Sequence, residues 1–364
     1  MPLRCGIVGL PNVGKSTIFN ALTAAGALAA NYPFATIDPN VGVVTVPDER
    51  IDKLSALIKP KKTLYTTINF VDIAGLVKGA NAGEGLGNQF LSHIREVDAI
   101  ANVVRCFEDD DVVHVEGSVN PERDIEIINT ELVLKDLESV SKKIGAAERQ
   151  AKSGDKDAKL AFEVYTKIKN HLDSGKPTRL MNLTEAEARV ASELFLLTSK
   201  PVLFICNVSE SEVHTENAHV KKVREIAEQE NARVVVISGK IESEIVELPK
   251  DERTDFLDSL GLKEPGLHSL IRETYTLLDL ISFLTAGPEE VRAWTIPRGT
   301  KNPQAAGTIH SDFERGFICA DVIWWEDFIK LGSEAACKEK GLVRTEGRDY
   351  IVKDGDVMHF KFNV

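Results

Sequence analysis

A phosphate-binding loop near the N-terminus is the segment that most constrains this fold. Residues 9–16 read G-L-P-N-V-G-K-S and match the pattern G-x-x-x-x-G-K-[ST] at every position. The apolar residues 4–8 predict a strand before the loop, and residues 16–22 predict a helix after it. Glycines let backbone N–H groups converge on anionic oxygens at a helix N-terminus, which carries partial positive charge. The sequence therefore predicts an α/β domain that binds a nucleotide phosphate.

The loop also assigns roles to individual side chains. Lys15 is expected to contact the β- and γ-phosphates and to act in catalysis, and the Ser16 hydroxyl is expected to ligate Mg²⁺. The residues predicted to contact the nucleotide here are Asn12, Val13, Gly14, Lys15, Ser16 and Thr17.

A second motif, D-x-x-G at residues 72–75, follows an apolar strand predicted at residues 67–71. At the strand end Asp72 can hold Mg²⁺ through water, while the Gly75 N–H can meet a γ-phosphate. Thr36 is placed to give Mg²⁺ a second hydroxyl ligand; the alternative is an ordinary loop threonine. Five glycines between residues 75 and 87 predict a flexible segment, where a switch that senses the γ-phosphate would lie.

With these motifs in place, the chain resembles the Obg-related translation-factor GTPases, and within them the YchF family. The matching stretches are residues 9–16, 30–40, 72–87, 98–109, 306–322 and 354–364. The resemblance implies a Ras-like P-loop NTPase domain with an inserted antiparallel helical hairpin and a C-terminal ubiquitin-like β-grasp (TGS) domain. It also implies a slow ATPase that engages the ribosome or ribosomal RNA.

The base-reading motif departs from that of ordinary GTPases, which carry N-K-x-D. Here the strand predicted at residues 201–206 ends in N-V-S-E, so Val208 replaces the lysine and Glu210 replaces the shorter aspartate. Asn207 has a donor and an acceptor that could meet adenine. Ser238 and Gly239 resemble the final base-contact loop. We therefore expect ATP in preference to GTP; the alternative is a GTPase in which Glu210 still reaches guanine.

The hydrolytic residue is less evident, because Leu76 stands where many GTPases place a water-orienting glutamine. His114, in a loop after the strand predicted at residues 100–105, could orient the water instead, or could be a surface histidine. By the resemblance, Asn12 could help hold K⁺ beside the phosphates, or be a plain loop residue. Leu76 also leaves open a binding module whose nucleotide is never turned over.

An inserted helical hairpin interrupts the nucleotide-binding domain. Apolar residues recur at helical spacing on both sides of a turn at residues 153–155. Residues 142–176 hold nine Lys and Arg against five Asp and Glu. This charge fits either a phosphate-rich partner or a solvated helical face. We predict a nucleotide-binding domain at 1–122 and 196–277, a helical arm at 123–195 and a TGS domain at 278–364.

The C-terminal part changes character. Residues 291–296, 316–322 and 357–362 predict strands, whereas residues 305–306 and 325–330 predict short helices. Residues 278–364 hold 11 basic and 14 acidic residues, which does not favour generic RNA binding. A local basic patch is conceivable, and the three tryptophans are interpreted as core or partner surface. The candidate patch residues are Arg298, Lys301, His310 and Arg315.

Overall composition excludes several classes of protein. The net charge of −12 gives no global attraction to RNA or membrane. No apolar run is long enough to span a bilayer, so we expect a cytoplasmic protein with no membrane contact and no DNA specificity. The cysteines show no C-x-x-C spacing and are predicted to be free thiols: Cys5, Cys106, Cys206, Cys319 and Cys337.

Overall fold

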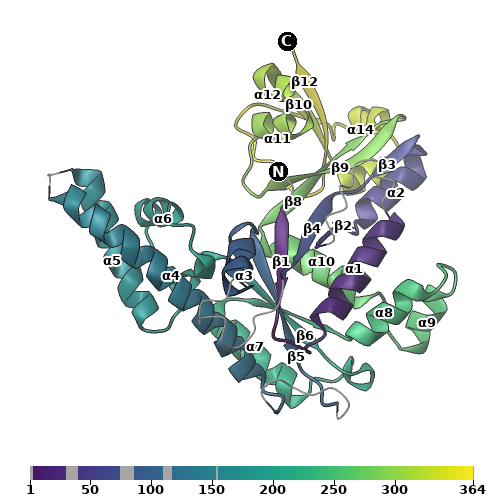
Figure 1. Ribbon diagram of the computed structural model, residues 1–364. Helices are drawn as coiled ribbons and strands as arrows, with labels where there is room; N and C mark the ends of the chain where they lie inside the picture. Colours follow the sequence, from purple (N-terminus) through teal and green to yellow (C-terminus); the bar gives the residue numbers. More distant parts are fainter. Residues whose placement is uncertain (1–2, 30–39, 74–85, 110–116, 153–154, 364) are drawn as a thin grey trace. The chain divides into compact units, whose positions relative to one another are not determined.

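The computed structural model describes residues 3–29, 40–73, 86–109, 117–152 and 155–363 (Figure 1). It divides into two compact units. The first contains residues 1–44 and 69–274, and the second contains residues 45–68 and 275–364. Two six-stranded sheets form the framework of the described chain. No helix within the described residues is long and apolar enough to cross a bilayer.

The first sheet has the strand order β2-β4-β1-β5-β6-β7. Its strands span Val41–Thr45 (β2), Thr67–Asp72 (β4), Arg4–Val8 (β1), Ala99–Arg105 (β5), Val202–Asn207 (β6) and Arg233–Ile237 (β7). The pairs of β1 with β4 and β5, and of β6 with β5 and β7, are parallel. Both β5 and β6 are buried along their whole length, as strands of a helix-covered parallel sheet must be. This confirms the predicted α/β fold.

Helices follow the strands of this sheet. Their bounds are Lys15–Ala29 (α1), Leu86–Arg95 (α3), Ala218–Glu230 (α7), Gly239–Glu247 (α8), Arg253–Ser259 (α9) and Gly266–Leu277 (α10). Helix α1 begins at Lys15, within the phosphate-binding motif, and packs against α8. The loop between β1 and α1 and the loop between β7 and α8 therefore lie at the same end of the sheet.

The inserted arm is an antiparallel pair of helices, α4 (Pro121–Ala151) and α5 (Lys156–Asp173), as predicted. The side chains of Asn120 and Asp155 cap the two N-termini. A separate apolar core, which includes Val140 and Ile168, holds the pair together. The short elements that complete the arm are η2 (Thr178–Leu180), α6 (Glu185–Ser192) and η3 (Leu197–Ser199).

The second unit is built on a mixed sheet with the order β11-β10-β12-β8-β9-β3. Its strands span Arg344–Glu346 (β11), Phe317–Trp324 (β10), Asp356–Phe362 (β12), Leu280–Ala286 (β8), Glu290–Pro297 (β9) and Lys62–Leu64 (β3). Its helices span Glu49–Ile58 (α2), Asn302–Ile309 (α11), Ser311–Arg315 (α12), Trp325–Leu331 (α13) and Glu334–Glu339 (α14). Strand β8 was not predicted from the sequence.

Alternating residues of the strands pack into two separate apolar cores in this unit. Phe283, Val322 and Phe360 join a core with α11, whereas Leu284 and Val357 join a core with α2 and α13. Because successive strand residues point to opposite faces, this alternation means that helices cover both faces of the sheet. Helices packed on a mixed sheet are the arrangement expected of the predicted β-grasp domain.

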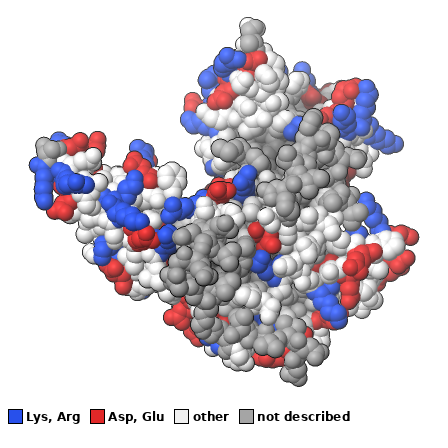
Figure 2. All heavy atoms as spheres, in the orientation of Figure 1, with Lys and Arg blue, Asp and Glu red and all other residues white. Residues whose placement is uncertain are grey.

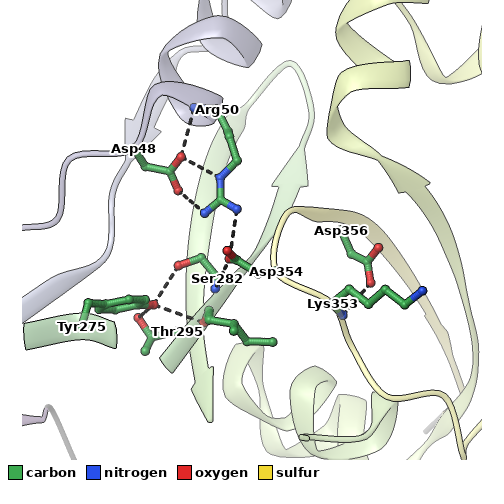
Figure 3. Close-up of polar contacts among 9 residues, drawn as sticks. Asp48, Arg50, Tyr275, Ser282, Thr295, Lys353, Asp354 and Asp356 are labelled. Atoms are coloured by element: carbon green, nitrogen blue, oxygen red, sulfur yellow. Dashed lines mark hydrogen bonds and ion pairs between the residues drawn. The ribbon is translucent and has the colours of Figure 1, made fainter. Parts of the chain in front are cut away.

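Residues 45–68 differ from the predicted domain division, which placed them in the nucleotide-binding domain. They supply α2 and β3 to the second unit, where β3 pairs in parallel with β9. Arg50 bonds both oxygens of Asp48, at 2.8 and 2.7 Å, and lies 3.0 Å from Asp354 (Figure 3). Asp354 in turn accepts the Ser282 N–H at 2.9 Å. These contacts and the shared core tie the inserted segment to the C-terminal sheet.

Candidate nucleotide-binding site

A pocket of about 920 Å³ opens at the carboxyl ends of the parallel strands in the first unit. Four loops that are far apart in the sequence line it: residues 10–17, 107–109, 207–210 and 238–240. Ligands bind at this edge in open α/β sheets, because the loops that follow the strands gather there. Ten predicted site residues line the pocket: Asn12, Gly14, Lys15, Ser16, Thr17, Asn207, Val208, Glu210, Ser238 and Gly239.

The phosphate-binding loop owes its shape to two residues with positive φ. Asn12 has a φ of 64°, and Gly14 has a φ of 90°. A Cβ atom at Gly14 would lie only 2.1 Å from Asn207 Nδ2, so a side chain is excluded there. Val13 between them is buried and is not among the residues that line the pocket, and its contact with the nucleotide stays a prediction. Its contribution is the backbone carbonyl described below.

At the phosphate end of the pocket, the Lys15 ammonium forms an ion pair with Asp72. Lys15 stands at the start of α1 and Asp72 at the end of β4, so the two motifs found in the sequence meet in space. Both side chains keep limited solvent access, 12% and 21%. The Ser16 hydroxyl and the Asp72 carboxylate are the hard oxygen donors that Mg²⁺ prefers, and they fit a Mg²⁺ site.

Asn207 has a structural role that the sequence did not predict. Its Nδ2 donates to the Val13 carbonyl at 2.9 Å, and its Oδ1 accepts the Gly239 N–H at 2.9 Å. The side chain is buried, and both ends of its amide are engaged with the backbone. That this amide meets adenine stays a prediction, for which one N–H of Nδ2 remains besides the bond to Val13. Asn207 joins the phosphate-binding loop to the 238–240 loop.

An ion pair marks the region where base selection is expected. Glu210 Oε2 lies 2.5 Å from Lys240 Nζ, and both residues line the pocket. Hydrogen bonding to Glu210 raises the pKa of Lys240, so the lysine stays charged. Beside them, the buried Ser238 hydroxyl has no hydrogen-bond partner among the described residues. The Val208 N–H donates to the Ile237 carbonyl. Val208 stands where the N-K-x-D motif has its lysine, so this position offers the pocket an apolar side chain.

Sequence reasoning missed Arg105, the last residue of β5. Its side chain is buried, and its guanidinium donates to the carbonyls of Phe107 and Asp109, each at 3.1 Å. It also lies 4.6 Å from the Phe107 ring centroid. Arg105 thus shapes the 107–109 wall of the pocket. The signal in the sequence was a single cation at the end of an otherwise apolar strand.

Three predicted site residues lie outside the described part of the chain. These are Thr36, Gly75 and His114. Among the described residues, no group of three or more His, Cys, Asp or Glu side chains could hold a metal. The described cysteines are all free, as predicted.

Two family models match the chain. A family described as "50S ribosome-binding GTPase" matches residues 4–144, and the YchF GTPase C-terminal family, described as a "Protein of unknown function", matches residues 280–363. Together they cover the phosphate-binding loop, the first part of the arm and most of the C-terminal unit.

Full-length relatives agree with these matches. The chain is 56% identical to "Ribosome-binding ATPase YchF" of Bacillus subtilis (strain 168) and 54% identical to the protein of the same name in Escherichia coli O157:H7, in each case over 100% of both chains. It also resembles the solved structure of the Schizosaccharomyces pombe YchF GTPase, with a TM-score of 0.89 and 38% identity. That match covers 99% of this chain and 97% of the other.

Proposed function

Because the chain belongs to the YchF family, we propose that it is a Mg²⁺-dependent ATPase that binds the ribosome and uses ATP in preference to GTP. The observation that carries this proposal is the convergence of the phosphate-binding loop, the Lys15–Asp72 pair and the Glu210–Lys240 pair on one pocket. Such a protein would act in the cytoplasm, as a switch that changes state with its nucleotide.

At the phosphate end, Lys15 is the group that would neutralise the β- and γ-phosphates. To do so its ammonium must leave Asp72, which then becomes available to a metal ion. Ser16 and Asp72, with Thr36 added, would hold Mg²⁺; when bound, that ion supplies positive charge to the phosphate oxygens. Binding of Mg²⁺ and nucleotide would thus give Lys15 and Asp72 new partners in place of each other.

At the base end, the proposed preference for ATP rests on the ion pair of Glu210 with Lys240. An aspartate in the N-K-x-D motif accepts hydrogen bonds from guanine, but Glu210 already bonds Lys240 at 2.5 Å. Guanine would have to break that ion pair, whereas adenine need not. The unpartnered Ser238 hydroxyl is a candidate acceptor for the adenine amine, since a buried polar group gains most from a new partner.

Turnover is proposed to be slow. Gly75 as a γ-phosphate contact, His114 as the group that orients water, and K⁺ held beside Asn12 remain predictions. K⁺ would supply charge where other enzymes of this class use an arginine. Hydrolysis measured in K⁺ and again in Na⁺ tests the last of these, because Asn12→Ala should remove any difference between the two salts.

For ribosome binding, the arm offers positive charge. In Figure 2, Lys and Arg side chains gather along the arm formed by α4 and α5. Lys142, Lys152 and Lys169 form ion pairs with acids one turn away on their own helices. No ion pair is found for Lys143 or Lys159 among the described residues. These unpaired cations are available to phosphate groups of RNA.

The test is ATP and GTP hydrolysis by the purified protein, alone and with ribosomes. We expect ATP turnover that needs Mg²⁺ and that Lys15→Ala abolishes. Lys61→Ala is the matched control, because Lys61 forms an exposed ion pair with Glu289 in the second unit. Equal turnover by Lys15→Ala and the unchanged protein would refute the proposed chemistry.

A further inference from the structure

Three cations of the predicted basic patch in the C-terminal unit are paired with acids. Arg298 pairs with Asp279 at 2.9 Å and Lys301 pairs with Asp349 at 2.8 Å. Arg315 pairs with Asp312. The charge of these three residues is offset by neighbouring acids, so they form no strong anion site.

A hollow of about 300 Å³ lies instead at the edge of the same sheet where β11 is the outer strand. Its walls combine an aromatic ring, two cations, one acid and two small or apolar residues. They are Trp324, Asp327, Gly341, Leu342, Arg344 and Lys353.

Strand register explains how these residues meet. Arg344 on β11 pairs with Val322 on β10, and Trp324, two residues further along β10, pairs with Asp356 on β12. Residues two apart on a strand share a face, so the Arg344 and Trp324 side chains lie on the same face. The contact of Arg344 Nη2 with Asp356 Oδ1 at 3.5 Å fits this arrangement.

The two cations differ in their partners: Arg344 pairs at long distance with Glu346 and Asp356, whereas no ion pair of the Lys353 ammonium is found among the described residues. The hydrogen bonds of the Arg344 guanidinium to described residues are long: 3.4 Å to Glu346, 3.3 Å to the Tyr350 hydroxyl and 3.5 Å to Asp356. Asp356 is fully buried and also accepts hydrogen bonds from the Tyr350 hydroxyl at 2.7 Å and from the Lys353 backbone N–H at 2.8 Å. Figure 3 shows the exposed Lys353 side chain extending away from that carboxylate.

We propose that this hollow binds one nucleotide of single-stranded RNA, with the base stacked on Trp324 and a phosphate held by Arg344 and Lys353. An aromatic face beside two cations matches the two parts of a nucleotide. Asp327 would accept a hydrogen bond from an exocyclic base amine, which cytosine has and uracil lacks. The site lies in the second unit and needs no hydrolysis. It rests on the proposed ribosome-binding function only for its biological partner.

The first test uses the full-length protein and the labelled RNA hexamers C6 and U6. We expect C6 to bind more tightly than U6 and to quench tryptophan fluorescence. All three tryptophans lie between residues 294 and 325, so the quench reports on the second unit alone. Trp324→Phe should remove most of the quench. RNA binding with no quench would place the RNA elsewhere and overturn the proposal.

Substitution of Lys353 tests the phosphate contact. Lys353→Gln should weaken C6 binding about fivefold and lower the slope of log K against log salt by about 0.7. Lys301→Gln is the matched control, because that lysine is already paired with Asp349; equal losses in both variants would contradict a specific site. Unchanged circular dichroism confirms that each variant folds.

The mononucleotide CMP separates RNA from a free nucleotide as the ligand. We expect CMP to bind far more weakly than C6, and equal affinity would overturn the assignment to RNA. ATP hydrolysis by Lys353→Gln should stay unchanged, so this proposal and the proposed ATPase activity can fail separately.

Discussion

The Asn207 amide donates to the Val13 carbonyl at 2.9 Å, and this one bond fixes the phosphate-binding loop to the strand that leads to the base-selecting residues. The same amide accepts the Gly239 N–H, so a single buried side chain joins three segments of the pocket. Gly14 must lack a side chain for this contact to form. Asn207 therefore positions the phosphate-binding loop and the 238–240 loop relative to each other.

Replacing Asn207 should impair both ends of the site. Asn207→Ala leaves the Val13 carbonyl and the Gly239 N–H without their partner, at a cost of about 1–3 kcal/mol each where they stay buried. We expect lower thermal stability and at least about tenfold weaker ATP binding, measured by titration with a fluorescent analogue.

Asn129→Ala is the matched control for this substitution. Asn129 is also an amide with two bonds, one to Glu230 at 3.0 Å and one from Arg179 at 3.1 Å, but it does not line the pocket. It should lose stability and keep its ATP affinity. Unchanged ATP binding by Asn207→Ala would show that Asn207 does not hold the nucleotide pocket in shape.

Exchange of partners between Lys15 and Asp72 predicts a distinctive dependence on Mg²⁺. Asp72→Asn removes the negative charge that pairs with Lys15 and that is proposed to hold Mg²⁺. ATP binding without Mg²⁺ should become tighter, because the ammonium is no longer shared, and added Mg²⁺ should strengthen it less. Calorimetry with Mg²⁺ and with EDTA measures this, and the same Mg²⁺ dependence as in the unchanged protein would contradict the exchange.

The Glu210–Lys240 pair predicts a change in base preference. Lys240→Ala frees the carboxylate to accept hydrogen bonds from guanine, so the ratio of ATP to GTP affinity should fall. The pair is exposed, and the change should be about two- to fivefold. Lys222→Ala is the control, since it breaks an exposed ion pair with Glu122 away from the pocket. A ratio that stays constant would mean that the ion pair has no part in selection.

Burial of Glu242 predicts a pH dependence of stability. Desolvation raises the pKa of its carboxyl to about 7, although it accepts N–H bonds from Gly266 and Leu267 at the start of α10. Between about pH 4.5 and 7 the folded state binds a proton that the unfolded state has lost. The stability contribution of Glu242 therefore falls as pH rises through this range, by an amount of the order of 1–3 kcal/mol.

Glu242→Gln should remove that part of the pH dependence, because glutamine keeps an acceptor oxygen and cannot ionise. We expect the variant to be more stable than the unchanged protein at pH 8, with a smaller difference at pH 5. Urea unfolding at several pH values measures both. Parallel stability curves for the two proteins would show that Glu242 does not titrate as described.

Membership of residues 45–68 in the second unit predicts how that unit behaves alone. A fragment of residues 278–364 lacks α2, β3 and the Arg50 contacts, so its core around Leu284 and Val357 is left open. We expect no cooperative thermal transition. Adding a peptide of residues 45–68 should restore one, and a cooperatively folded fragment without the peptide would contradict this view.

Much of the fold follows from local pattern. The phosphate-binding loop, the buried parallel strands and the long helices of the arm are marked by short-range spacing, and all were predicted. Residues 45–68 were misplaced because they lie between two strands of the first sheet, and nothing local reveals that β3 pairs with β9.

Parts of the site were harder to predict for a related reason. The sequence identified the residue types at 207, 210 and 238, but Asn207 acts through backbone atoms of Val13 and Gly239. A backbone partner leaves no trace in residue identity. The ion pairs of Lys15 with Asp72 and of Glu210 with Lys240 likewise depend on side-chain positions that only the assembled loops define.

Competition between ATP and GTP for the purified protein in Mg²⁺ and K⁺ tests the base preference most directly. We expect tighter binding of ATP, because guanine would have to compete with Lys240 for the Glu210 carboxylate. Tighter binding of GTP would show that the longer carboxylate still reaches guanine, and would make the protein a GTPase switch.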